Sequence, residues 1–163
     1  MSDNPGASTL VLGVGNTLLT DEGVGVHVVN HLRQHHSGLS GVTFMDGGTL
    51  SFTLAESIAE ADWLIVVDAA ELKAPPGTVR VFEDLAMDRF LGVGKRSVHE
   101  VGLLDLLDIA RLTDTLPVRR ALVGIQPEQF GWGDWPSPPV AAAIPAAARR
   151  VLDLIRQWAP LSD

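Results

Sequence analysis

The sequence predicts an α/β fold in which helices cover both faces of a twisted, mostly parallel five-stranded sheet, as a three-layer α/β/α sandwich. The first observation is that short apolar runs of strand type occupy residues 10–12, 42–45 and 63–67. The second is that the segments between them, the one after Glu22 and residues 51–61, have the length and apolar spacing of helices. The resulting order βαβαβ predicts parallel strands.

The rest of the chain adds two strands and two helices. A Pro/Gly turn at residues 74–77 precedes a short strand at 79–82, and this turn-like connection indicates an antiparallel edge strand. A helix with an apolar leucine face begins near Ser97, and a strand follows at residues 121–125. We expect a final helix from residue 138 or 139 to about residue 158.

Length and composition exclude several classes of protein. The 163 residues can bury a core without disulfides, and the absence of cysteine removes thiolate ligands and cysteine nucleophiles. A net charge of −8 argues against a nucleic-acid surface, and no apolar run approaches the roughly 20 residues that span a bilayer. We therefore expect a cytoplasmic monomer without nucleic-acid or membrane partners. Its single domain should occupy residues 9–159, between a flexible N-terminus (1–8) and a C-terminal tail (160–163).

The glycine-rich segment at residues 13–25 is the most informative stretch of the chain. It lies between a strand and a helix, as a dinucleotide-binding turn would, but the third glycine of that fingerprint is replaced by Leu18. Asp21 and Glu22 would also repel a phosphate, and no Gly-Lys-Ser/Thr follows as in a P-loop. The two acids could simply favour the helix dipole, but their position points to a cation rather than a nucleotide.

Further carboxylates follow the next two strands. Asp46 comes just after the second apolar run, and Asp68 just after the third. Because parallel strands connected by crossovers of one hand end at the same edge, Asp21 or Glu22, Asp46 and Asp68 should gather where open α/β sheets bind ligands. Clustered carboxylates repel unless they share protons or hold a metal ion.

Two helix starts carry capping signals, and one of them also carries a histidine. Ser97 and Glu100 form a capping box, and Ser137 before Pro138 is a candidate N-cap. His99 is not explained by capping. At the N-terminus of a helix, the positive end of the dipole disfavours an imidazolium and favours the neutral form that binds metals.

With these residues placed, nearly the whole chain resembles the hydrogenase maturation endopeptidases, which remove a C-terminal extension from the large subunit of nickel–iron hydrogenases. The resemblance depends on the order and spacing of several motifs: Gly13-Val14-Gly15-Asn16, Asp21-Glu22-Gly23-Val24-Gly25, Asp46-Gly47-Gly48-Thr49, Val67-Asp68-Ala69, His99-Glu100-Val101-Gly102-Leu103 and Leu122-Val123-Gly124-Ile125-Gln126-Pro127-Glu128. Glu100 stands where relatives often have glutamine, and the loop at residues 131–135 is not a general family feature.

The resemblance implies a site and a partner. The metal-binding residues of the family fall on Glu22, Asp68 and His99, which we take as candidate metal-binding and catalytic residues. The partner would be a hydrogenase large-subunit precursor, and the activity that of an endopeptidase, classified in the family as aspartic-type. Asp46 is a candidate general base or orienter of the water, although an Asp-Gly-Gly turn can be purely structural.

Two routes remain open for the metal. Two carboxylates and one imidazole suit a divalent ion such as nickel, zinc or manganese, and they leave positions for water or substrate. In the first route, the protein holds its own ion, which activates water directly. In the second route, nickel arrives in the precursor, and Glu22, Asp68 and His99 recognise it. We favour the second route because an open site without thiolates is poorly suited to retaining its own ion. No nucleotide cofactor is expected.

Three histidines and two tryptophans are further candidates for binding a metal or a partner. His27, His31 and His35 recur every four residues, a spacing that can place two imidazoles on one metal, but we interpret them as a solvated flank of the helix. Trp132 and Trp135 lie in a Gly/Pro-rich loop and could either anchor a protein partner or fold back over the helices.

Two alternative functions follow from the same residues. A binding module that checks nickel without cleaving would retain the same three candidate ligands. A dinucleotide-binding oxidoreductase would use Gly13, Gly15 and the acid Asp46 at the end of the second strand, but Leu18 and Glu22 weaken this interpretation.

Overall fold

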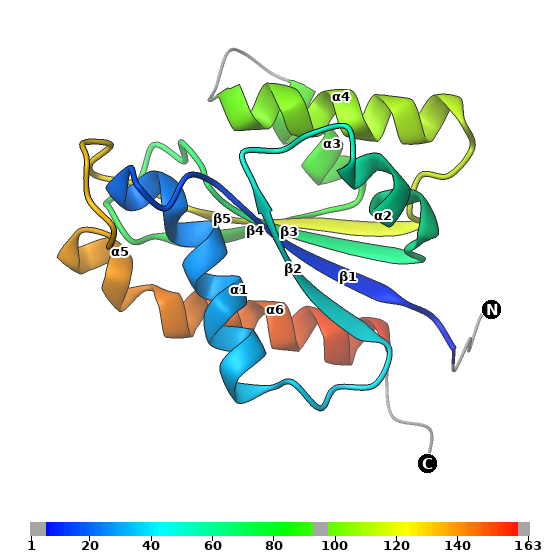
Figure 1. The fold of residues 1–163 in the computed structure, drawn as a ribbon, viewed down its shortest axis with the longest axis horizontal. Helices are drawn as coiled ribbons and strands as arrows, with labels where there is room; N and C mark the ends of the chain where they lie inside the picture. The colour runs from blue at the N-terminus through cyan, green and yellow to red at the C-terminus, as the bar shows by residue number, and fades with distance from the viewer. Residues whose placement is uncertain (1–5, 93–97, 160–163) are drawn as a thin grey trace.

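The computed structural model describes residues 6–92 and 98–159, and for residues 98–101 it describes the backbone alone. The elements alternate along the chain as predicted, with strand followed by helix in the first half (Figure 1). In order they are β1 (Thr9–Val14), η1 (Thr20–Gly23), α1 (Val24–His35), β2 (Val42–Gly48), α2 (Leu54–Glu60), β3 (Trp63–Ala69), β4 (Val79–Glu83), α3 (Leu85–Gly92), α4 (Val98–Leu112), β5 (Arg119–Ile125), α5 (Pro138–Ala142) and α6 (Ile144–Trp158).

The five strands form one sheet in the order β2-β1-β3-β5-β4. Strands β2, β1, β3 and β5 are parallel, and β4 pairs antiparallel with β5 at the edge. Both the mostly parallel sheet and the antiparallel edge strand are therefore confirmed. β3 lies between β1 and β5 and is buried along its whole length, as expected of a strand in a sheet covered on both faces.

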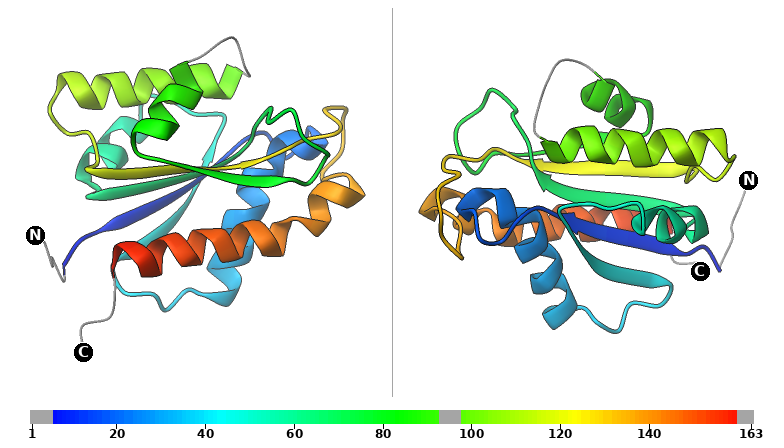
Figure 2. Two further views of the ribbon diagram at one scale, coloured as in Figure 1. Left: turned by 180° about the vertical axis from the view of Figure 1, so that it is seen from behind. Right: turned by 45° about the horizontal axis from the view of Figure 1, so that its top comes forward.

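Helices cover both faces of the sheet (Figures 1 and 2). Alternate strand residues such as Val11, Ile65 and Val67 form a core with α1, α5 and α6. The residues between them, such as Leu12 and Val66, form a second core with α2, α3 and α4. This alternation confirms the three-layer sandwich, and it fixes the face of the sheet on which each strand-end side chain lies.

Two helical segments differ from the prediction. The sequence reading missed α3, whose buried Met87 and Leu91 are four residues apart. The last helix was predicted as continuous, but it is divided into α5 and α6 at Ala143. Pro145 has no backbone N–H to donate to the carbonyl four residues earlier, so a continuous helix would lose this hydrogen bond.

Some predictions fall on residues whose structure lies outside the described part. They are the Ser97 and Glu100 capping box and the outer limits of the domain at residues 1–5 and 160–163. Within the ranges 6–92 and 98–159, no helix has the length and apolar character needed to cross a bilayer.

Candidate functional site

The strand ends meet at one edge of the sheet, as predicted from the parallel order. Gly13 near the end of β1 is in register with Asp46 of β2 on one side and with Val67 of β3 on the other. Asp68 follows Val67 directly. The acids after the second and third apolar runs thus share this edge with the turn after β1, which carries Asp21 and Glu22.

The turn after β1 packs backbone against backbone, which explains its glycines. A Cβ on Gly15, whose φ is +135°, would lie 1.8 Å from the carbonyl oxygen of Glu22. A Cβ on Gly25 would lie 2.1 Å from the carbonyl oxygen of Val67, next to Asp68. Only glycine permits these approaches. They bring the residues around Glu22 onto the ends of β1 and β3, so the glycine motif holds this turn against the strand ends.

Asp21 holds this turn to the loop after β5. Its side chain is fully buried, and its Oδ2 accepts hydrogen bonds from the backbone N–H groups of Glu128 and Gln129, both at 2.8 Å. Its Oδ1 accepts one from the Ser137 N–H at 2.7 Å, and the Ser137 hydroxyl donates to the same carboxylate. One interpretation of Asp21 from the sequence was that it favours the dipole of the helix that follows it. Instead it joins segments more than a hundred residues apart in the chain.

The surroundings of Asp21 also fix its charge. Burial raises the pKa of its carboxyl, but hydrogen bonds from the backbone at Gln129, Glu128 and Ser137 and from the Ser137 hydroxyl lower it more, so the pKa lies below its ordinary value of 3.8. Asp21 is therefore ionised and saturated with donors, as suits a structural carboxylate. Ser137 was a predicted N-cap, but its side chain makes no cap hydrogen bond.

Asp68 and Asp46 lie on opposite faces of the sheet. Asp68 is two residues after Val66, on the face covered by α2, α3 and α4, and it is 2% exposed. Asp46 is two residues after Phe44, on the face covered by α1 and α6. The strand register thus brings both residues to the same edge but directs their side chains apart.

Asp46 is exposed and its described hydrogen bond is local. Its Oδ1 accepts a hydrogen bond from the Gly48 N–H at 2.8 Å, and Gly48 adopts a positive φ of 52°. The Gly48 carbonyl in turn accepts from the Gly15 N–H at 2.7 Å. These contacts are those of a turn-forming aspartate, and the turn after β2 supports the turn after β1.

The third candidate ligand, His99, lies in the first turn of α4, on the same sheet face as Asp68. Its side chain falls outside the described residues, so the predicted group of Glu22, Asp68 and His99 is described only in part. Among the side chains that are described, no three His, Asp or Glu residues form a metal-binding group. Glu22 is half-buried in η1, at the same edge of the sheet as Asp68, the penultimate residue of β3.

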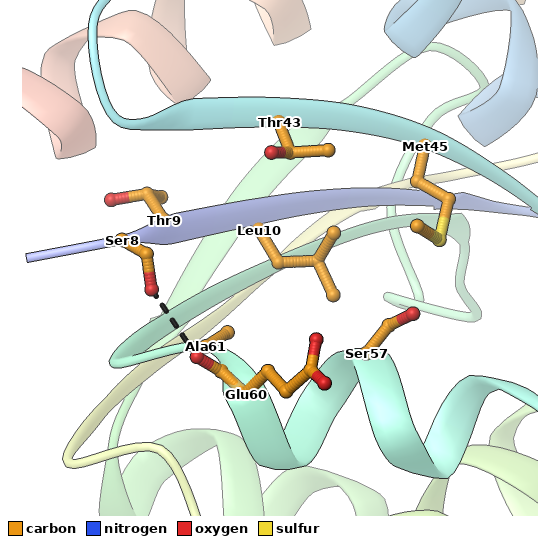
Figure 3. Close-up of a pocket in the computed structure, with 8 residues that line it drawn as sticks. All are labelled: Ser8, Thr9, Leu10, Thr43, Met45, Ser57, Glu60 and Ala61. Atoms are coloured by element: carbon orange, nitrogen blue, oxygen red, sulfur yellow. Dashed lines mark hydrogen bonds between the residues drawn. The ribbon is translucent and has the colours of Figure 1, made fainter.

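Two pockets of the described surface lie at opposite ends of the sheet. One, of about 290 Å³, lies between the loop after β2 and α4, and it is lined by Leu50, Ser51, Phe52, Gly102, Asp105 and Leu106. The other, of about 210 Å³, lies where β1 and β2 begin, and its Ser8 hydroxyl donates to the Glu60 carbonyl (Figure 3). Only the first is near the carboxyl edge and the start of α4.

The histidine stripe of α1 does not form a common metal site. The ring of His27 packs edge-on against Trp135, with centroids 4.7 Å apart. His31 instead stacks on His35, whose Nδ1 lies 2.8 Å from the His31 carbonyl. Burial, with the nearby charges of His35 and His36, lowers the pKa of His31. The three imidazoles thus have separate surroundings. His35 is exposed, as expected of a solvated flank, but the buried Nε2 of His27 corrects that interpretation for the first turn of the helix.

The sheet order and the acids at its carboxyl edge define an α/β/α protein whose candidate site lies at the strand ends, and comparison with known proteins gives its family. The family model described as "Hydrogenase maturation protease" matches residues 26–154. The chain belongs to the hydrogenase maturation protease family.

Individual relatives agree over most of their length. The chain is 39% identical to the hydrogenase 2 maturation protease of Escherichia coli K12, over 91% of this chain and 90% of the relative. It is 37% identical to the hydrogenase expression/formation protein HupD of Rhizobium leguminosarum bv. viciae, over 94% and 77%. The structure of the hydrogenase maturating endopeptidase HybD from E. coli superposes with a TM-score of 0.84 at 36% identity, covering 93% of both chains.

Sequence reasoning found the strand-end acids but missed the residues that hold them. Ser137 and the backbone of Glu128 and Gln129 became visible only when their contacts with Asp21 were known. Gln126 was also missed as an anchor. It is buried, and its Oε1 accepts a hydrogen bond from the Leu72 N–H at 2.7 Å, which fixes the chain after β3. Its place in a Gly-Ile-Gln-Pro-Glu motif was the available signal.

Proposed function

We propose that the protein is a cytoplasmic endopeptidase that removes the C-terminal extension of a nickel–iron hydrogenase large-subunit precursor after nickel insertion. The observation that carries the proposal is the placement of Glu22 and Asp68 at the ends of β1 and β3, in a chain of the maturation protease family. The proposal is supported by the glycine contacts of the turn, which hold it against the ends of β1 and β3, at the edge where open α/β sheets commonly bind ligands.

The donor set suits an ion that belongs to the substrate. Glu22, Asp68 and His99 would supply two carboxylate oxygens and one imidazole nitrogen, which are ligands that nickel accepts. When bound, the nickel of the precursor would supply a positive charge at the cleavage site. The carboxylates would recognise this charge and orient the precursor, so that only a nickel-loaded subunit is positioned for hydrolysis.

The cleavage adds one water across a peptide bond, so its oxygen joins the carbonyl carbon and the leaving amine gains a proton. A carboxylate oxygen that does not bind the ion can accept a proton from the attacking water and pass it to the leaving amine. We assign this role to the second oxygen of Glu22 or of Asp68. Asp46 is directed to the opposite face of the sheet, and we propose that it shapes the turn after β2.

Intact-mass analysis of a cognate large-subunit precursor tests the proposal. The precursor is incubated with the protein once with nickel inserted and once without it, and Glu22→Gln and Asp68→Asn serve as matched isosteric variants. We expect loss of the extension only from the loaded precursor and only with the wild-type protein. Cleavage of both precursors would discard nickel recognition. Binding of the loaded precursor without cleavage would instead support the module that checks nickel.

A further inference from the structure

Four large apolar side chains are exposed together at the carboxyl edge of the sheet. They are Leu18 in the turn after β1, at 58% exposed, and Phe130, Trp132 and Trp135 in the loop after β5, at 57%, 84% and 58%. We call these four residues the aromatic patch. Phenylalanine and tryptophan are usually buried, and contiguous exposed apolar surface on a protein commonly marks an interaction site.

The loop that carries the aromatic patch is held in place by the turn after β1. The Thr20 N–H donates to the Gly133 carbonyl, and the Gly133 N–H donates to the Leu18 carbonyl, both at 2.9 Å. The Thr20 hydroxyl adds a hydrogen bond to the Gln129 carbonyl at 2.7 Å. Together with the Asp21 contacts, these bonds place the loop beside η1 (Figure 1). The aromatic side chains are thus pre-organised, which lowers the entropic cost of binding.

The Trp135 side of the aromatic patch packs against helix α1. Trp135 packs edge-on against His27 of α1, whose Nε2 is buried with no hydrogen-bond partner among the described residues. Burial lowers the pKa of His27, while the charge of Asp134 opposes the shift. A neutral imidazole therefore forms an apolar support under Trp135, and Trp132, the most exposed of the four, remains turned toward solvent.

The two segments that carry the patch contain acidic residues but no basic ones. Neither residues 9–32 nor residues 121–148 contain a lysine or an arginine. The loop after β5 instead carries the exposed acids Glu128 and Asp134, and the neighbouring turn carries Glu22. A partner that matches this surface presents an apolar recess with a basic rim.

We propose that the aromatic patch is the docking surface for the folded body of the substrate precursor, which contacts it with such an apolar recess and basic rim. The inference rests on the proposed function. Because Leu18 and Glu22 belong to the same turn, a protein bound on the patch lies next to the carboxylate site. Docking there would explain how the protein selects one folded substrate, while the carboxylates act only on its extension.

Binding of the nickel-loaded precursor to single variants tests the proposal. Trp132→Ser removes the most exposed member of the patch, and Leu112→Ser is the matched control, because Leu112 is 87% exposed at the far end of α4. Affinity is measured by calorimetric titration with a precursor whose cleavage site is blocked, and KM and kcat are measured with the cleavable precursor. We expect Trp132→Ser to weaken binding and raise KM by at least about tenfold, without a change in kcat. Leu112→Ser should have the affinity, KM and kcat of the wild type.

The other possible outcomes distinguish failure of the docking surface from failure of the proposed function. Equal affinities for the wild type, Trp132→Ser and Leu112→Ser, with normal cleavage, would overturn the docking surface and leave the proposed function intact. A wild-type protein that neither binds nor cleaves the loaded precursor would overturn both. Self-association of the wild type that Trp132→Ser abolishes, without a change in precursor affinity, would assign the patch to a second copy of the chain and overturn the proposal.

The charge complementarity has its own test. The double variant Glu128→Gln, Asp134→Asn keeps the size of both side chains and the backbone N–H that Glu128 donates to Asp21. We expect it to bind the precursor several-fold more weakly at low salt, with a flatter dependence of affinity on salt than the wild type. An unchanged salt dependence would overturn the basic rim assigned to the partner.

Discussion

The turn after β1 and the turn after β2 use the same residue types in different ways. Each contains one glycine with positive φ, Gly15 or Gly48, and an aspartate whose side chain accepts hydrogen bonding from the backbone. Asp46 in the second turn accepts from Gly48, two residues away, whereas Asp21 in the first accepts from residues more than a hundred positions away. The first turn is therefore held by the whole domain, and the second mainly by itself.

This difference bears on where a site can be built. Groups that act on a substrate must be held within a fraction of an ångström, and long-range contacts provide such constraint better than a local turn does. In the turn after β1, Asp21 supplies the constraint, and its neighbour Glu22 is left half-buried at the edge. We infer that Asp21 positions the turn and that Glu22 is the residue of this turn that contacts the substrate.

The largest effect is expected from filling the backbone contact beneath the turn after β1. In Gly25→Ala the new Cβ would meet the Val67 carbonyl oxygen at 2.1 Å and the Val14 carbonyl oxygen at 2.6 Å. Because neither backbone can move without disturbing the sheet, we expect a loss of more than about 4 kcal/mol in the free energy of unfolding. Urea denaturation measures it. Gly38→Ala is the control, since nothing lies within 4 Å of its Cβ.

A loss of activity without a loss of stability is expected from Asp68→Asn. The amide keeps the shape of the buried carboxylate but weakens its binding to a cation. Loss of a residue behind a metal ligand typically costs ten- to a hundredfold, so loss of a ligand should reduce processing of the nickel-loaded precursor by at least about a hundredfold. Intact-mass time courses give the rate. Processing at the wild-type rate would remove Asp68 from the site.

A smaller effect, on stability, is expected from Asp21→Asn. The amide nitrogen would face backbone N–H groups that now donate to a carboxylate, so we expect a loss of about 2 kcal/mol in the free energy of unfolding. Chemical denaturation at about pH 7 measures this loss. A free energy of unfolding equal to that of the wild type would contradict the positioning role of Asp21.

The loss from Asp21→Asn should depend on pH in a defined direction. The folded-state pKa of Asp21 lies below its ordinary value of 3.8, so its contribution is complete above that value and disappears as the pH falls through the folded pKa. The difference between wild type and Asp21→Asn should therefore stay constant from about pH 7 to about pH 4 and shrink only as the pH falls further. A difference that grows in acid would contradict the hydrogen-bond account.

The smallest effect is expected in the turn after β2. Asn at position 46 retains an oxygen that can accept from the Gly48 N–H, so Asp46→Asn should change the free energy of unfolding by less than about 0.5 kcal/mol. Asp46→Ala loses this bond and should cost about 1 kcal/mol. Thermal unfolding of the two variants gives the comparison. Equal stabilities would show that the bond contributes nothing.

The sequence predicted well what depends on periodicity. Apolar runs gave the parallel strands, and the Pro/Gly turn before β4 gave the antiparallel edge. The break at Ala143 was missed, although Pro145 signals it, because the apolar pattern continues through α5 and α6. Helix α3 is anchored by Asp88, which accepts a hydrogen bond from Arg120 Nε at 2.9 Å, and a contact of this kind leaves no periodic trace.

The sequence predicted that the candidate site lies at the carboxyl edge of the sheet. It did not predict on which face of the sheet each side chain lies. Strand order alone brought Asp46 and Asp68 together, whereas the registers Gly13↔Asp46 and Gly13↔Val67 separate their side chains. The hydrogen bond from the Ser137 hydroxyl to the Asp21 carboxylate could not be predicted, because no local sequence pattern links residues so far apart in the chain.

The most direct test compares Glu22→Gln with Asp46→Asn in the same assay. Both variants replace a carboxylate at the carboxyl edge with its amide, one in each turn. The processing rate of the nickel-loaded precursor is measured by intact mass, with unfolding curves as a control for folding. We predict that Glu22→Gln is slower than wild type by at least about a hundredfold and that Asp46→Asn stays within about threefold. A wild-type rate for Glu22→Gln with a large loss for Asp46→Asn would contradict the assignment of the site to the turn after β1.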